Sequence, residues 1–311
     1  MADKLVGKCF FAKTLFGEYL GQYGSSLIAC QSDEFVLVQA EKKRELKDIE
    51  FDDQLLKEKV SKNASPENPK SKMYDIMFKE ELDLPKEGIK ITIGGNANPK
   101  DKNYTAVLSI ALAKAVSQFS VQPWKADKIS ATALLVEKSN EESFVACHGV
   151  ALHGAPIFIE EIVADIKKSK PIKVQKPLFI VTIKGNEPLE EKIVGELAKK
   201  NKSDKAAVDS MVNEVKKIIF DAKKELAFSG MSTLGLLLNK NHAVLKRIGI
   251  ACPETDTLVK LAQVEGAFGS KITRAGNSGN VIALCENEKQ QDKLVASYLA
   301  RGFKATKSKV Q

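Results

Sequence analysis

The stretch EGAFGSKITRAGNSGNVIALCEN, Glu265 to Asn287, joins a glycine-rich segment to a short apolar run. Its glycines, at positions 266, 269, 276 and 279, flank Lys271, and residues 281–284 follow as a predicted strand. Glycine-rich turns next to a strand let a backbone approach phosphate closely. The stretch therefore raises the question of whether the chain holds the other parts of a nucleotide-binding site.

Composition and length indicate a globular protein. The chain has 311 residues, of which 43% are hydrophobic and 28% are charged, so it is long enough for two domains with a real core. No apolar run approaches the roughly 18 residues that span a bilayer, and the N-terminus lacks the features of a signal peptide. Five scattered cysteines without C-x-x-C spacing predict reduced, mostly buried thiols. We therefore expect a cytoplasmic protein that does not bind membranes.

The positive charge is concentrated in the second half of the chain. Residues 171–311 hold 24 Lys and Arg against 15 Asp and Glu, a net charge of +9, whereas residues 1–170 have a net charge of −1. This asymmetry suggests an acidic partner for the C-terminal half, for example through Lys199, Lys200, Lys202 and Lys205. Solubility is the favoured explanation of the charge itself, because the lysines are dispersed along predicted helices. Nucleic acid is a less favoured partner, since no arginine–aromatic cluster is present.

The order of predicted elements indicates two α/β domains. A polar, proline-bearing, lysine-rich segment at 61–72 predicts a surface loop, and a similar segment at 167–177 predicts a domain boundary. We therefore expect an N-terminal domain over 1–170 and a C-terminal domain over 171–311. Strands are predicted at 35–40, 89–95, 131–139 and 178–185. Helices are predicted at 104–119, 188–200, 206–228, 231–249 and 254–266. The end of a strand, a helix and a lysine-rich tail are predicted to close the chain.

Four stretches in this order resemble one family. LFGEYLGQYGSSLIAC (15–30) is similar to the opening motif of mevalonate kinases, and residues 88–116 match the stretch through their second motif. CHGVALHGAPIF (147–158) lies where their HGTPSGxDN segment belongs, and residues 236–284 resemble their C-terminal helices and third motif. The chain thus resembles the GHMP superfamily (galactokinase, homoserine, mevalonate and phosphomevalonate kinases), and the mevalonate kinase branch in particular.

The resemblance implies a fold and a chemistry. The implied fold is a two-domain α/β (α+β) fold, with an N-terminal ribosomal-protein-S5-like domain and a C-terminal ferredoxin-like domain. The implied chemistry is phosphoryl transfer from ATP, with Mg²⁺, to a small hydroxylated acceptor. In that family a small-residue loop and a helix N-terminus hold the triphosphate. An aspartate lies beside the acceptor hydroxyl, an acid and a serine hold the metal, and a lysine stabilises the transferring charge.

The second motif is strongly altered. Its glycine–serine loop aligns with residues 100–106, KDKNYTA, which contain no glycine. Tyr104 would fill space that the phosphates occupy, and Asp101 would repel them. Lys100 and Lys102 offset that charge in part, but flexible lysines position phosphate less well than a fixed nest of amides.

The catalytic and metal positions are also altered. With His148 aligned to the histidine of HGTPSGxDN, the aspartate position falls on Ala155 and the metal-binding glutamate position on Phe144. Neither side chain can accept a proton or bind magnesium. Residues 143–158 contain no acid, and Glu160 is the first one downstream. His153 is a conceivable substitute base, but we expect both histidines to be packing or turn residues.

The first and third motifs are kept in part. Glu18 is in place, Lys13 is near the position of the family lysine, and two of the third-motif glycines are replaced by Arg274 and Ser278. We interpret the surviving glycines as turn residues. The remnants of a cofactor site are then Lys13, Glu18, Lys102, Gly276 and Gly279, with no catalytic residue and no metal ligand.

Three hypotheses follow. The first is a catalytically inactive, mevalonate-kinase-like structural or interaction component of a larger assembly, without a cofactor, in the cytoplasm and associated with a partner such as microtubules in a cilium. The second is a divergent ATP- and Mg²⁺-dependent small-molecule kinase that uses relocated residues. The third is a nucleotide or metabolite sensor without turnover. The chain lacks the family's metal ligand, catalytic base and phosphate-binding loop together. Because the contributions of such groups to catalysis are strongly non-additive, this combined loss favours the first hypothesis.

Overall fold

The computed structural model describes residues 4–43, 45–46, 49–61, 69–80, 88–120, 122–137, 141–162, 169–185, 190–273 and 279–311. The chain forms two compact units. The first unit consists of residues 1–11, 34–140 and 147–152, and the second of residues 12–33, 141–146 and 153–311. The predicted boundary between residues 170 and 171 stays a prediction, because compactness alone does not decide which segments fold together.

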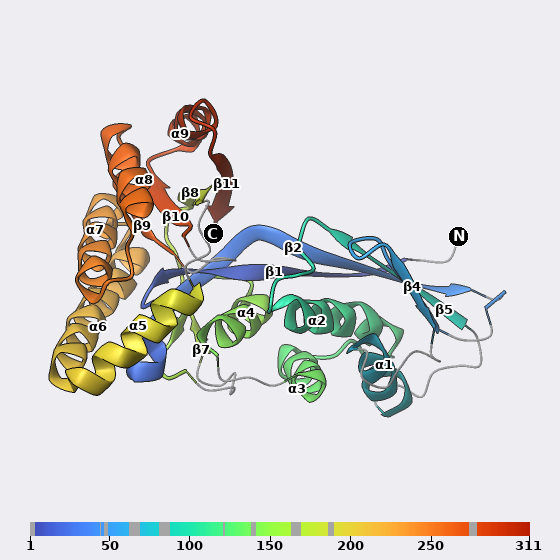
Figure 1. The fold of residues 1–311 in the computed structure, drawn as a ribbon. Coiled ribbons are helices and arrows are strands. Elements are labelled where there is room, and N and C mark those ends of the chain that lie inside the picture. The colour runs from blue at the N-terminus through green and yellow to red at the C-terminus, as the bar shows by residue number, and fades with distance from the viewer. Residues whose placement is uncertain are drawn as a thin grey trace. The chain divides into compact units, whose positions relative to one another are not determined.

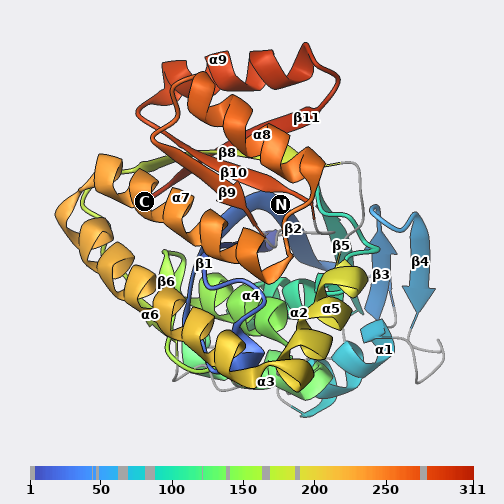
Figure 2. The same cartoon turned by 60° about the vertical axis from the view of Figure 1, so that its left-hand side comes forward.

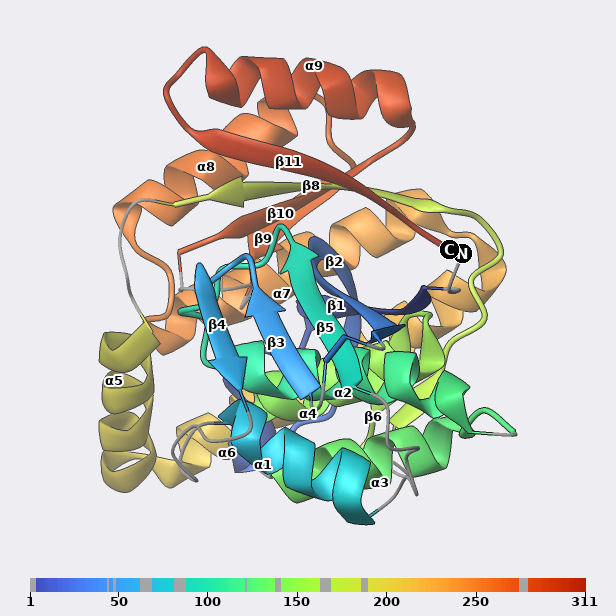
Figure 3. The same cartoon turned by 90° about the vertical axis from the view of Figure 1, so that its right-hand side faces the viewer.

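The first unit is built on a mixed sheet with its helices on one side (Figure 3). The alternating sequence of β5 buries Ile89, Ile91 and Ile93, which is the pattern of a half-buried strand. β5 pairs antiparallel with β2 and parallel with β3, and β3 pairs antiparallel with β4. The strands are β1 (Leu5–Phe16), β2 (Leu27–Lys43), β3 (Ile49–Asp53), β4 (Glu58–Ser61) and β5 (Gly88–Gly95), of which β1 and β2 continue into the second unit.

The helices of the first unit include one that was predicted as a strand. The segment 131–139 lies mostly in α3 (Ala126–Val136), so the strand prediction there is wrong. Its buried side chains Ile129, Ala133 and Val136 recur every three or four residues, and this helical spacing overrides the β-propensity of a short apolar run. The other elements are α1 (Pro69–Tyr74), a π-helix (Asp75–Glu80), α2 (Tyr104–Val116), a 3-10 turn (Ser117–Phe119) and α4 (Glu142–His153), which both units share.

The second unit contains a four-stranded antiparallel sheet in the order β11-β8-β10-β9. In chain order this is fourth, first, third, second, the arrangement of a ferredoxin-like domain, as predicted. The predicted lysine-rich tail is a strand, β11, rather than a loose end. The strands of this sheet are β8 (Leu178–Lys184), β9 (Gly269–Ile272), β10 (Val281–Cys285) and β11 (Lys304–Val310). Two further strands, β6 (Ile157–Ile159) and β7 (Ser169–Pro171), belong to the other sheet, in which β6 pairs antiparallel with both β2 and β7.

Helices cover both faces of this sheet (Figures 1 and 2). Along β10, Ile282 and Leu284 join the core beneath α6 and α7, whereas Val281 and Ala283 join the core beneath α8 and α9. The strand is therefore apolar throughout because it is buried on both faces. The helices are α5 (Glu190–Ser203), α6 (Lys205–Phe228), α7 (Met231–Ile248), α8 (Pro253–Val264) and α9 (Glu288–Leu299), with a 3-10 turn at Gly21–Tyr23. No described helix has the length and apolarity to cross a membrane.

The glycines of the opening stretch have packing and turn roles. Gly269 of β9 lies against the backbone of α7, where an added Cβ would stand 1.9 Å from the carbonyl oxygen of Gly235. Gly266 and Gly279 have φ angles of 92° and 107°, a region that side chains rarely adopt. The described glycines of this stretch therefore shape the second unit, which agrees with their interpretation as structural residues.

We predict that Gly269→Ala destabilises the protein by roughly 1–3 kcal/mol, because the new methyl group meets backbone that cannot move aside. Gly195→Ala is the matched control, since nothing lies within 4 Å of its added Cβ in α5 and alanine favours a helix. Urea unfolding monitored by circular dichroism measures both. Equal midpoints for the two variants would contradict the close packing of β9 on α7.

Candidate functional site

The loop before α2, residues 96–103, is where the second motif predicts a phosphate cradle. Its backbone amides donate to acceptors inside the first unit. Asn96 and Ala97 donate to the Phe35 carbonyl, both at 3.2 Å, and Lys100 donates to the Asn98 side chain at 3.1 Å. These amides are therefore already satisfied by the protein itself.

Asp101 closes the same loop at the start of α2. Its carboxylate accepts the N–H of Asn103 at 2.8 Å, and its carbonyl accepts the N–H of Tyr104 at 2.9 Å. A carboxylate near a helix N-terminus is favoured by the helix dipole. The Asp101 carboxylate therefore bonds to the N–H of Asn103, the residue directly before α2. Lys102, a predicted remnant of the cofactor site, is exposed in this loop.

Tyr104 is held inside the first unit. Its ring is buried, and its hydroxyl lies 3.2 Å from a carboxylate oxygen of Asp53, which also forms a 2.9 Å ion pair with Lys70. Burial, and then the charge of Asp53, raise the pKa of the Tyr104 phenol. The first residue of α2 is therefore a packed and bonded side chain.

In the second unit, Glu18 and Lys271 form an ion pair that is completely buried. The Lys271 ammonium also donates to the Ile272 carbonyl at 2.6 Å. Burial lowers the pKa of Lys271, and the charge of Glu18 opposes that shift. The pair joins the turn after β1 to β9, so the predicted remnant Glu18 has a structural partner.

Lys13, the second remnant, is also buried and bonded. Its ammonium donates to the hydroxyls of Thr182 at 2.8 Å and Ser308 at 2.9 Å, and lies 3.5 Å from a carboxylate oxygen of Asp33. Lys13 therefore ties β1 to β8 and β11 within the second unit. The remnant Gly279 lies two residues before β10, and Gly276, with Arg274 and Ser278, lies outside the described residues.

Glu142 is a buried carboxylate that the sequence did not single out. Its two oxygens accept the N–H groups of Tyr19 and Gly21, each at 3.2 Å. It lies two residues before Phe144, the predicted metal position, which is a buried core side chain. The signal for Glu142 was a pair of acids directly before an apolar helix. Among the described residues, no group of three or more His, Cys, Asp and Glu is arranged to hold a metal ion.

The segment around Ala155 permits a second alignment. His153, Gly154 and Pro156 repeat the H-G-x-P of the family segment five residues after His148. In that register the aspartate position falls on Glu160, an exposed residue with a weak 3.8 Å ion pair to Lys170, instead of on the partly buried Ala155. His153 is exposed, with its ring 3.1 Å from the Ser169 hydroxyl. The segment therefore has two registers, one with Ala155 and one with Glu160 at the aspartate position.

His242, in the NKNH segment of α7, joins three elements of the second unit. Its Nδ1 accepts the N–H of Ile272 at 3.4 Å, and its Nε2 lies 3.2 Å from a carboxylate oxygen of Asp256 in α8. His242 therefore helps to pack α7 against β9 and α8.

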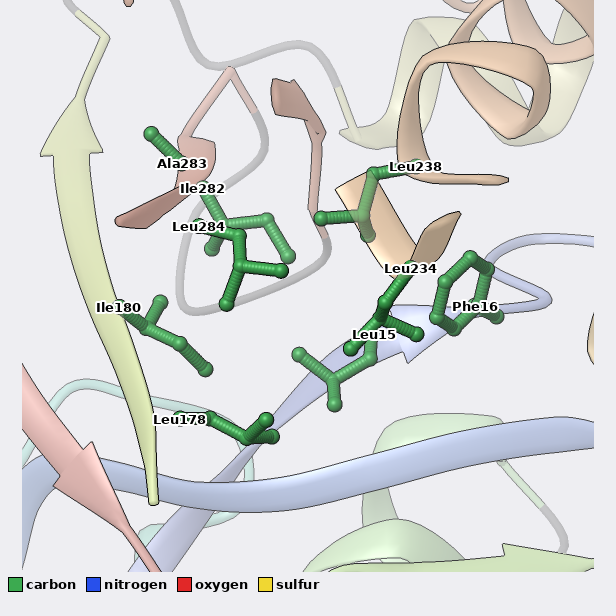
Figure 4. A pocket seen from close by; sticks show the side chains of 9 residues that line it. All are labelled: Leu15, Phe16, Leu178, Ile180, Leu234, Leu238, Ile282, Ala283 and Leu284. Atoms are coloured by element: carbon green, nitrogen blue, oxygen red, sulfur yellow. The ribbon is translucent and has the colours of Figure 1, made fainter. Parts of the chain in front are cut away.

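The pocket in Figure 4 lies in the core of the second unit. Its walls are the side chains of β1, β8, β10 and α7, and none of the lining side chains is polar. Such a space offers no charged or hydroxyl group to hold a phosphate or an alcohol. The lining residues are Leu15, Phe16, Leu178, Ile180, Leu234, Leu238, Ile282, Ala283 and Leu284.

We predict that Lys271→Met destabilises the protein by about 3–5 kcal/mol, because it leaves the Glu18 carboxylate buried without its cation. The double variant Glu18→Leu/Lys271→Met is expected to recover most of that loss, since an apolar pair needs no counter-charge. Lys293→Met, which removes an exposed ion pair with Glu265, is the control and should cost less than about 1 kcal/mol. Urea unfolding curves test this, and a double variant no more stable than Lys271→Met would contradict it.

We predict an acid-sensitive contribution from His148, which is buried in the first unit. Burial lowers its pKa from 6.5 to about 4, so its neutral form contributes stability above pH 6.5 that is lost as the pH falls toward 4. The full loss is on the order of 3 kcal/mol. The free energy of unfolding should fall less steeply between pH 6.5 and 4 in His148→Leu, or in His148→Gln, than in the wild type. If the free energy of unfolding fell equally steeply with pH in the variants and in the wild type, the prediction would be contradicted.

Comparison with known proteins shows which proteins share this fold. Residues 222–304 match the family model for the C-terminal part of GHMP kinases. The structure resembles that of Leishmania (L. major) mevalonate kinase in complex with R-mevalonate, with a TM-score of 0.79 and 21% identity over 100% of this chain and 96% of that one. The chain therefore has the GHMP kinase fold, and its predicted fold class is confirmed.

The relatives found by sequence are mevalonate kinases. The mevalonate kinase of Methanocaldococcus jannaschii is 28% identical over 305 residues, which cover 90% of this chain and 91% of the relative. The mevalonate kinase of Pyrococcus furiosus is 37% identical over 97 residues, 31% of this chain and 28% of the relative. The chain is a mevalonate-kinase-like protein, as its motifs predicted.

Proposed function

We propose that this chain is a mevalonate-kinase-like protein that does not transfer phosphate and acts by binding other proteins. The observation that carries the proposal is the loop before α2, in which Asp101 bonds to the N–H of Asn103. An incoming phosphate would compete with this carboxylate for the amide and would meet its negative charge. The nucleotide loop is thus filled by the chain's own groups.

The charged residues kept from the family support the same proposal. Glu18 and Lys271 neutralise each other in the interior, and Lys13 is bonded to two hydroxyl groups. A buried side chain that already has its partners cannot turn toward a substrate without breaking those bonds. The packing of the second unit is a sufficient reason for these residues to persist.

The second candidate is a divergent ATP-dependent small-molecule kinase. The curated relatives favour it, because they are mevalonate kinases and one aligns over nine-tenths of this chain. The second register of the H-G-x-P segment also favours it, since Glu160 then replaces the family aspartate with another acid. In this candidate Glu160 would accept the proton of the acceptor hydroxyl.

A partner of acidic character belongs to the main proposal. The net charge of +9 over residues 171–311 is its support, because opposite charge accelerates association. A cytoplasmic assembly with an acidic polymer, such as the microtubules of a cilium, is one partner that fits this charge.

We predict that ATP with Mg²⁺ does not raise the unfolding temperature of the purified protein and that no phosphorylated mevalonate forms above a no-enzyme control. Ligand at 100 times its Kd would stabilise the fold by about 2.7 kcal/mol, which a thermal shift assay detects easily. Radiolabelled ATP with mevalonate measures turnover. The mevalonate kinase of Methanocaldococcus jannaschii serves as the positive control.

The outcomes separate the candidates. Turnover that disappears in Glu160→Gln and persists in Glu161→Gln would establish the kinase and overturn the main proposal. A thermal shift with ATP but without product would instead support a nucleotide sensor. If ATP causes no thermal shift and no product forms, the result supports the non-catalytic protein.

A further inference from the structure

Helix α6 carries an outward stripe in which aromatic and basic side chains alternate. Lys217, Phe220, Lys224 and Phe228 are spaced three or four residues apart, so they lie on one face of the helix. The opposite face is buried in the core of the second unit. Phe220 is 60% exposed and Phe228 is 81% exposed. Two phenylalanines open to solvent on one helix face are a feature that core packing does not explain.

The neighbouring helix extends this surface. α6 and α7 run antiparallel, since Arg247 pairs with Glu214 at one end and a short turn joins the helices at the other. At a rise of about 1.5 Å per residue, Leu236 lies near the level of Lys224. Leu236 is exposed, and Lys240 follows it one turn later. The surface, termed the α6–α7 face, consists of Lys217, Phe220, Lys224, Phe228, Leu236 and Lys240.

The charge of this face is available to a partner. Residues 216–228 hold four lysines against Asp221 and Glu225. The Lys224 ammonium lies 4.1 Å from the centre of the Phe220 ring. Among the described residues, neither Lys217 nor Lys224 is paired with a carboxylate.

The lysines near the end of α5, in contrast, are partly neutralised. Lys199 pairs with Glu196 at 2.9 Å and Lys205 with Asp209 at 2.6 Å. Lys200 donates to the Arg247 carbonyl. This cluster, predicted from the sequence as a docking surface, therefore offers less free positive charge than the α6–α7 face.

We propose that the α6–α7 face binds an acidic amphipathic helix of a partner protein. The stripe from Lys217 to Phe228 is about 16 Å long, which matches three turns of a partner helix. Apolar side chains of that helix would cover Phe220 and Phe228, and its Glu and Asp would pair with the lysines beside them. The inference concerns the second unit alone and holds whether or not the chain transfers phosphate.

The test uses the full chain and a fluorescein-labelled 18-residue helical peptide with leucines on one face and glutamates elsewhere. Fluorescence anisotropy should show binding that weakens at least tenfold in Phe228→Ser and in Phe220→Ser. Val264→Ser is the matched control, because Val264 is 83% exposed on α8 and its loss should leave binding unchanged. A peptide of the same composition with its leucines scattered around the helix should bind at least tenfold more weakly.

Charge reversal adds a second readout. Lys217→Glu/Lys224→Glu should slow association and reduce its dependence on salt, whereas Lys199→Glu/Lys205→Glu should change the association rate by less than twofold. Four results would overturn the proposal: no binding; equal binding of the scattered peptide or of polyglutamate; Phe228-dependent binding to phosphatidylserine vesicles in place of the peptide; or Phe228-dependent self-association in sedimentation, which would make a second copy the occupant.

Discussion

The second unit depends on one buried ion pair, Glu18 with Lys271. Two charges removed from water are costly unless each satisfies the other, so the geometry of both backbones around them is tightly constrained. The turn after β1 adopts unusual backbone angles, with φ values of 98° at Gly17 and 63° at Tyr19. Glu142 fixes this turn further by accepting the N–H groups of Tyr19 and Gly21.

The two units hold their charged and polar groups in different ways. In the first unit Asp101 bonds to Asn103 in the loop before α2, and Tyr104 is a buried side chain bonded to Asp53. In the second unit Lys13, Glu18 and Lys271 are buried and bonded to other groups of the same unit. Sequence similarity to mevalonate kinases over nine-tenths of the chain accompanies a shared fold, and a fold alone does not define a reaction.

The sequence predicted the elements with strong periodicity and failed where distant contacts decide. The long helices of the second unit and the strands β5 and β8 were predicted because their apolar spacing is regular. α3 was predicted as a strand because its short apolar run is ambiguous, and β11 was missed because it is a lysine-rich edge strand. The hydroxyl partners of Lys13 and the cation that pairs with Glu18 could not be predicted, since they lie between about 170 and 300 residues away along the chain. The glycine Gly269 was recognised, but its contact with Gly235 required the packed structure.

The self-bonded loop before α2 has a consequence for the protein in the cell. A kinase whose loop awaits phosphate is most stable when nucleotide is abundant, because ligand binding draws the population toward the folded state. If this chain binds no nucleotide, as proposed, such a ligand contributes nothing to its stability, and the bond of Asp101 to Asn103 forms within the loop as the unit folds. Its lifetime against proteolysis would then be set by the chain itself and would stay the same when the energy charge of the cell falls.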